Sequence, residues 1–285
     1  MQYSSALLVV AFAATNVFSH GVIDSVKGAN AVTMPGLSVA DGTPRDCATP
    51  SCGAEADTSI LRTNEIGTSK ATALGRTSTG PVDAATMISA FMGGDANTTS
   101  AKAAREVHEA MMMKRSLGVR QASGGVKTPK GTTETGVKAA TGMGASAGLP
   151  TCADDGTLTM NFHQVNQDGA GPLTAMVDAT SGGTDPAAFK TATVTQNVPG
   201  IGIGGLSAAS VMDFPVAIQM PAGMTCSGTS GGASNVCVAK MQNAALAGPF
   251  GGSVAFTQSA AAKKRSIEYN LSKRRFARAI ASNEN

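Results

Sequence analysis

The sequence of 285 residues contains no tryptophan, only two tyrosines and only 14% charged side chains. So few tyrosines and tryptophans argue against a typical glycosidase, which presents such side chains as contact platforms for sugars. The low charge, together with 42% apolar residues, excludes wholesale disorder and supplies a core for one large domain. No apolar run reaches the roughly 20 residues that a bilayer requires, so we expect no membrane span.

Positive charge is concentrated at the end of the chain. Residues 261–285 contain seven lysines and arginines and two glutamates, whereas the whole chain has a net charge of only +3. The remainder is therefore slightly negative, and we expect no nucleic acid as a partner. We interpret 261–285 as a basic tail exposed to solvent; the alternative is a basic amphipathic helix.

The N-terminus predicts the compartment. Residues 6–14 form an apolar run of the length found in a secretory signal, and Val17 and Ser19 occupy positions −3 and −1 before His20. We therefore assign 1–19 as a signal peptide. The mature protein is expected to begin at His20 and to be a secreted monomer, extracellular or associated with the cell wall.

The five cysteines agree with export. Four of them lie at short spacings and are predicted to form two local disulfides, Cys47 with Cys52 and Cys226 with Cys237. Cys152 remains, either as a buried thiol or as a partner that changes this pairing. Asn97 and Asn270 begin glycosylation sequons.

The alternation of apolar and polar residues along the chain predicts its fold. Short alternating segments separated by Gly and Pro follow one another from residue 158 to residue 256, which favours a mostly-β protein. Helical periodicity is convincing only over 83–92 and 100–116, and residues 119–150 lack any period. We predict one immunoglobulin/fibronectin-III-like β-sandwich over 20–260, with long loops and one or two helices in a flexible insertion at about 95–150.

Two of the three histidines form the candidate site. An N-terminal His20 offers its amine and its ring Nδ1 to one metal ion, and a second imidazole completes a set of three nitrogens, which suits Cu(II). His163 is the expected partner: it alternates with Met160 and Phe162 along a predicted strand and should point away from the core. The alternative is a signal cleavage that happens to leave a histidine, together with an unrelated surface histidine.

Other motifs are weaker. His108-Glu109 has Met112 where a zinc protease would need its second histidine. The glycine-rich segment 199–205 lacks the strand–helix context of a phosphate-binding loop and is interpreted as a turn.

Several longer motifs resemble one family. They are HGVIDSVKGAN at 20–30, DGTPRDC at 41–47, FHQVNQDGAGP at 162–172, PGIGIGG at 199–205 and GPFGG at 248–252. The sequence resembles the Egh-type virulence factors of fungal plant and insect pathogens, which include appressorium-specific surface proteins. The resemblance implies secretion during host penetration and, since some members are proposed to be lytic polysaccharide monooxygenases, a sandwich fold with a copper-binding histidine brace.

The resemblance assigns roles to individual residues. His20 and His163 match the brace, Phe256 is the candidate for the axial aromatic position, and Gln164 or Gln258 is the candidate second-sphere group. The implied function is copper-dependent oxidation of chitin or another cell-wall polysaccharide. The alternative is a non-catalytic surface or effector protein that binds or masks cell-wall glycan.

Overall fold

The computed structural model describes residues 20–93, 124–167, 169–200, 207, 209–245 and 247–283. The predicted signal peptide 1–19, the predicted helix 100–116 with His108, and the sequon at Asn97 lie outside the described residues.

Strands dominate the described chain. They pair antiparallel throughout, in the order β2-β1-β7-β10-β9-β8-β12-β13-β3-β4-β5, with β6 beside β10 and β11 beside β12. Their bounds are β1 Gly21–Lys27, β2 Thr33–Pro35, β3 Ser59–Ile60, β4 Arg76–Thr77, β5 Gly80–Pro81, β6 Val126–Lys127, β7 Thr157–Gln164, β8 Thr174–Asp178, β9 Lys190–Gln196, β10 Met212–Gln219, β11 Gly228–Ser230, β12 Ala233–Gln242 and β13 Phe250–Phe256.

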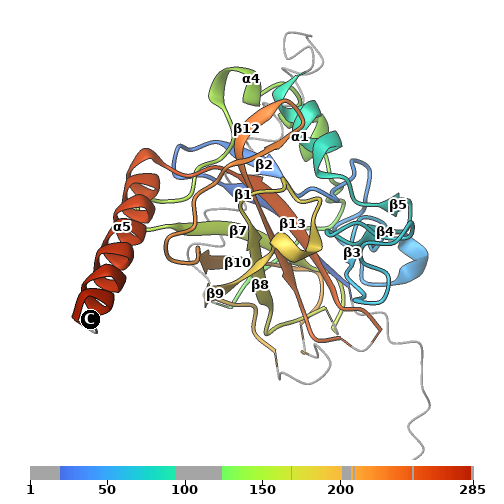
Figure 1. Ribbon diagram of the computed structural model, residues 1–285. Coiled ribbons are helices and arrows are strands. Elements are labelled where there is room, and N and C mark those ends of the chain that lie inside the picture. The colour runs from blue at the N-terminus through green and yellow to red at the C-terminus, as the bar shows by residue number, and fades with distance from the viewer. Residues whose placement is uncertain are drawn as a thin grey trace, which may run out of the picture.

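The sheet folds back on itself into two layers. Strand β9 pairs with β10 on one side and with β8 on the other, so it joins the two halves. The two halves also meet away from β9, because β13 of one half packs against β1 of the other. A Cβ added to Gly252 on β13 would lie 2.7 Å from the backbone nitrogen of Ile23 on β1. The two layers meet at the centre of the molecule (Figure 1). This architecture confirms the predicted mostly-β sandwich.

The core lies between these layers. Leu158, Met160 and Phe162 of β7 are buried, as their alternation predicted, and Phe214 lies opposite Phe162 on β10. Replacing a fully buried phenylalanine such as Phe162 by alanine typically costs about 3–5 kcal/mol.

Helices occupy the periphery. Helix α1 (Ala84–Met92) confirms the helix predicted over 83–92 and is capped by the side chain of Asp83, which accepts a hydrogen bond from the Ala85 N–H. The C-terminal helix α5 (Ala260–Asn283) occupies the segment interpreted as a tail; it is helical and mostly exposed. No helix in the described segments is long and apolar enough to cross a bilayer.

Part of the expected flexible insertion is structured. Residues 124–150 contain β6 and two short helices, α3 (Gly136–Ala140) and α4 (Gly144–Ala147). The carboxylate of Asp41 accepts hydrogen bonds from the N–H groups of Val137 and Lys138 at the start of α3. The structure corrects the loop expectation here, because the order of this segment depends on partners far away in the sequence.

Both predicted disulfides are present, Cys47–Cys52 and Cys226–Cys237. Cys152 is a buried thiol without a disulfide partner, which decides between the two alternatives left open by the sequence.

Candidate metal centre

Strands β1, β7 and β10 bring the two histidines to one face of the first layer. His163 on β7 lies opposite Val22 on β1, and His20 immediately precedes β1, where its carbonyl accepts a hydrogen bond from the Val165 N–H. Residues opposite one another share a face, and so do residues two apart on a strand. His20 and His163 are therefore diagonal neighbours on the same face.

His163 points away from the inter-layer core that Phe162 faces, as the alternation along the strand predicted. It is nevertheless fully buried, with an exposed fraction of 0%. The outer face of the layer is itself covered by polar segments, among them the one that contains Thr128, whose hydroxyl reaches the neighbouring Asp213. Alternation along β7 reports which face a residue takes but not what covers that face.

The imidazole of His163 is held by Asp213. The two residues lie opposite one another on β7 and β10, with Nδ1 of His163 3.0 Å from Oδ1 of Asp213. A carboxylate only accepts hydrogen bonds, so Nδ1 is the donor and Nε2 of the neutral ring retains its lone pair. Nε2 is buried and has no hydrogen-bond partner among the described residues. A histidine that donates one ring N–H to a carboxylate and keeps the other nitrogen available is typical of metal ligands.

His20 is surrounded by polar groups and one aromatic ring. Its backbone N–H donates to Oδ1 of Asn166 at 2.8 Å, and its Nδ1 lies 3.2 Å from Oε1 of Glu55. The ring of Phe250 packs against the imidazole, with 4.4 Å between the ring centroids. Burial raises the pKa of Glu55 to about 7, against the opposing effect of the hydrogen bond from Asn166.

The brace hypothesis assigns three nitrogens to one Cu(II): the backbone nitrogen and Nδ1 of His20, and Nε2 of His163. Register places the two histidines on one face, with Nδ1 of His20 beside Glu55. Within the described segments, no group of three or more His, Cys, Asp or Glu side chains could hold a metal. The brace hypothesis therefore depends on the His20 backbone nitrogen as its third donor, and this nitrogen becomes an amine only when the preceding residues are removed.

The structure does not bring Phe256 to the histidines. Phe256 is buried on β13 opposite Cys237, whereas the aromatic ring beside His20 belongs to Phe250, at the other end of the same strand. Six residues of strand separate the two phenylalanines by roughly 20 Å. The sequence signal for Phe250 was its place in GPFGG at 248–252, one of the motifs that resemble the family.

The two candidate glutamines also have defined surroundings. Gln164 lies on the opposite face of β7 from His163, and its Nε2 donates to the carbonyl of Asn166 at 2.8 Å, so it supports the residue that binds His20. Gln258 lies at the start of the α5 region, where its side chain bonds the backbone of Cys226 and Met224. Only Gln164 is therefore close to the candidate site in the chain and in space.

A buried ion-pair cluster stabilises the segments beside the site. The guanidinium of Arg45, fully buried, contacts Asp57 at 2.9 and 2.6 Å and Glu134 at 3.1 Å. Burial by itself lowers the pKa of Arg45, but the two carboxylates raise it above its ordinary value. A further link to the site runs through Asn161, whose amide donates to Asp24 at 2.9 Å and to Asp213 at 3.5 Å.

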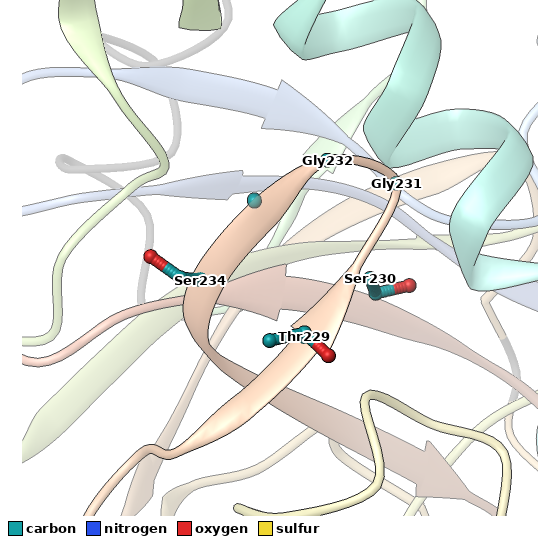
Figure 2. Close-up of a pocket in the computed structure, with 6 residues that line it drawn as sticks. Thr229, Ser230, Gly231, Gly232 and Ser234 are labelled. Atoms are coloured by element: carbon teal, nitrogen blue, oxygen red, sulfur yellow. The ribbon is translucent and has the colours of Figure 1, made fainter.

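A surface hollow lies elsewhere. It is formed by the β11–β12 hairpin, with the hydroxyls of Thr229, Ser230 and Ser234 around it, next to helix α1 (Figure 2). It shares no residue with the histidine pair.

A family model and curated relatives match this chain, and all of them are described as virulence factors. Residues 18–251 match a family model described as Egh16-like virulence factor. The appressoria-specific virulence factor GAS2 of Pyricularia oryzae is 65% identical over 286 aligned positions, which cover 100% of this chain and 99% of that protein. The appressoria-specific virulence factor GAS1 of the same fungus is 41% identical over 107 residues, 38% of this chain and 41% of GAS1. No solved structure matches the chain.

Proposed function

Since the chain belongs to the Egh16-like virulence factor family, we propose that the mature protein is a secreted copper protein that oxidises a cell-wall polysaccharide such as chitin during host penetration. The family membership makes it a fungal virulence-associated protein. The copper site, the activity and the substrate are the proposal.

One observation carries the proposal: the buried Nε2 of His163, which has no hydrogen-bond partner among the described residues, beside a predicted N-terminal histidine. Leaving a buried polar nitrogen unsatisfied costs free energy, about 1–3 kcal/mol. A buried polar atom without a hydrogen-bond partner is commonly found where that atom binds a ligand.

Each residue of the site has a separate task. His20 would hold copper through its amine and Nδ1, and His163 through Nε2. Asp213 fixes the orientation and tautomer of the His163 ring, while Asn166 orients the His20 backbone nitrogen. Phe250 packs on the His20 ring and limits its rotation. Bound copper supplies the capacity to activate oxygen or peroxide for oxidation of a C–H bond.

The overall reaction balances with hydrogen peroxide as the oxidant. One sugar C–H becomes C–OH, the peroxide O–O bond breaks, and one water is released. Where the hydroxylated carbon is bonded to a glycosidic oxygen, its C–OH becomes C=O while the bond to that oxygen breaks. The hydroxyl proton passes to the leaving oxygen, which becomes a hydroxyl at the new chain end.

The test begins with protein secreted from a fungal host and confirmed by mass spectrometry to start at His20. We expect one Cu(II) per chain by calorimetry, a nitrogen-dominated electron paramagnetic resonance spectrum, and oxidised oligosaccharides from chitin with peroxide and a reductant. His163→Ala should lose tight binding while circular dichroism shows that it is folded. His108→Ala, the matched control, should bind as wild type does. Wild-type protein without copper affinity would overturn the proposal.

A second function, non-catalytic binding or masking of glycan, is favoured by the burial of the histidines. The exposed fractions are 7% for His20 and 0% for His163, which is little surface for a flat crystalline substrate. Copper binding without oxidised product, together with sedimentation of the protein on chitin, would select this alternative.

A further inference from the structure

The contacts that anchor helix α5 to the body lie in its first half. Ala262 in its first turn is buried in the core, and the side chain of Asn270 donates to the Gly223 carbonyl at 2.8 Å. Just before the helix, the Ser259 hydroxyl donates to Asp154. Beyond these anchors the helix runs away from the sandwich as an arm (Figure 1).

This arm differs in composition from the rest of the surface. All the large hydrophobic side chains that are exposed in the described part of the chain lie on α5: Ile267, Tyr269, Leu271, Phe276 and Ile280. The same helix has seven cations and a single acidic side chain, Glu268. The cations are Lys263, Lys264, Arg265, Lys273, Arg274, Arg275 and Arg278.

The helical repeat separates two faces of α5. With 100° per residue, the side opposite the buried Ala262 is occupied by residues spaced three or four apart. We call this set the outer stripe: Lys264, Ile267, Glu268, Leu271, Arg274, Arg275 and Arg278. All of them are exposed, and two aliphatic side chains thus lie among four cations and one glutamate on the face turned away from the body.

We propose that the outer stripe binds the surface of an anionic phospholipid membrane. The charge of α5 is complementary to acidic headgroups, and Lys and Arg near such a surface each contribute substantially to binding. Ile267 and Leu271 can enter the headgroup boundary, as aliphatic residues of interfacial helices do. An acidic polysaccharide would engage the cations alone and would leave this aliphatic pair exposed to water. This function is independent of the copper site.

The experiment is co-sedimentation of full-length mature protein with phosphatidylcholine vesicles and with vesicles containing 30% phosphatidylserine. We expect binding only to the anionic vesicles and a marked loss when salt rises from 50 to 500 mM, because salt screens exposed charges. Arg274→Gln with Arg278→Gln should weaken binding about 10- to 30-fold. Ile267→Ser with Leu271→Ser should weaken it at constant charge.

The matched control is Arg265→Gln with Lys273→Gln, which removes the same charge from the other side of α5. It should weaken binding clearly less than Arg274→Gln with Arg278→Gln. Equal losses in the two charge variants would overturn the assignment to the outer stripe. Equal binding to neutral vesicles, or binding to polygalacturonate but not to anionic vesicles, would overturn the membrane as the partner.

Discussion

The carboxylate of Asp213 lies 3.0 Å from Nδ1 of His163, directly across the β7–β10 pair, and both side chains are buried. The second oxygen of Asp213 accepts a hydrogen bond from Thr128 at 3.2 Å, so the carboxylate is fixed from two sides. The pair therefore decides which nitrogen of His163 is available to a ligand.

Removing this carboxylate should change the tautomer of His163 before any metal is added. In wild type at pH 8, nitrogen-15 NMR should show the proton on Nδ1. Asp213→Ala should shift it toward Nε2 and weaken Cu(II) binding about 10- to 100-fold. Asp213→Asn keeps one acceptor oxygen but adds an NH2 group that can donate to Nδ1, so it should restore both properties only in part.

A tautomer that does not change in Asp213→Ala would show that the carboxylate has only a structural role. An Nδ1–H tautomer in wild type without copper binding would instead leave the positioning intact and contradict the copper site. The two failures are thus distinguishable.

The sequence predicted the histidine of the His163–Asp213 pair but not the aspartate. Alternation along β7 identified the face of His163, and the signal boundary identified His20, because both depend on local patterns. Asp213 stood in the region of short alternating segments predicted over 158–256, and nothing local indicates which residue of β7 it faces. Register between strands distant in the sequence is a property of the folded sheet.

Local sequence patterns also did not predict that His163 is buried. The polar outer face of β7 would be exposed in an isolated sandwich, but the segment that contains Thr128 reaches Asp213, 85 residues away in the sequence, beside that face. The same long-range contacts order residues 124–150, whose composition resembles that of a loop. Local sequence also could not tell which phenylalanine of β13 lies near His20. Phe250 and Phe256 are both in this strand, and only the packing of β13 against β1 distinguishes them.

Arg45→Met should destabilise the protein strongly. It leaves Asp57 and Glu134 buried without their cation, and breaking such a cluster costs about 3–5 kcal/mol. Arg62→Met is the matched control, because Arg62 is 41% exposed and its loss should cost at most about 1 kcal/mol. Urea unfolding measures both. Copper affinity of folded Arg45→Met should equal that of wild type, and a selective loss of binding would place this cluster in the metal site.

Lys240 should make stability depend on alkaline pH. Its ammonium is buried, donates to the Ala73 carbonyl at 2.9 Å and lies over the Phe189 ring; burial lowers its pKa, opposed by Asp178. Between this lowered pKa and the ordinary value of 10.5, the unfolded chain binds more protons than the folded one, so stability contributed by this group rises with pH. Lys240→Met should remove that rise from melting curves measured between pH 8 and 10.5. An identical pH dependence in the two proteins would contradict the assignment.

The end of α5 should be dispensable for folding, whereas its start should not. A chain ending at Asn270 retains the buried Ala262 and the contact with Gly223, so its melting temperature should match that of the full chain. A chain ending at Ala260 loses both contacts and uncovers core side chains near Ala262, which should lower the free energy of unfolding by about 1–3 kcal/mol. Thermal and urea unfolding of the two truncated chains provide the comparison. Equal stability of both would mean that the first turns of α5 contribute nothing to the core, and a loss on removing only 271–285 would mean that the arm itself packs on the body.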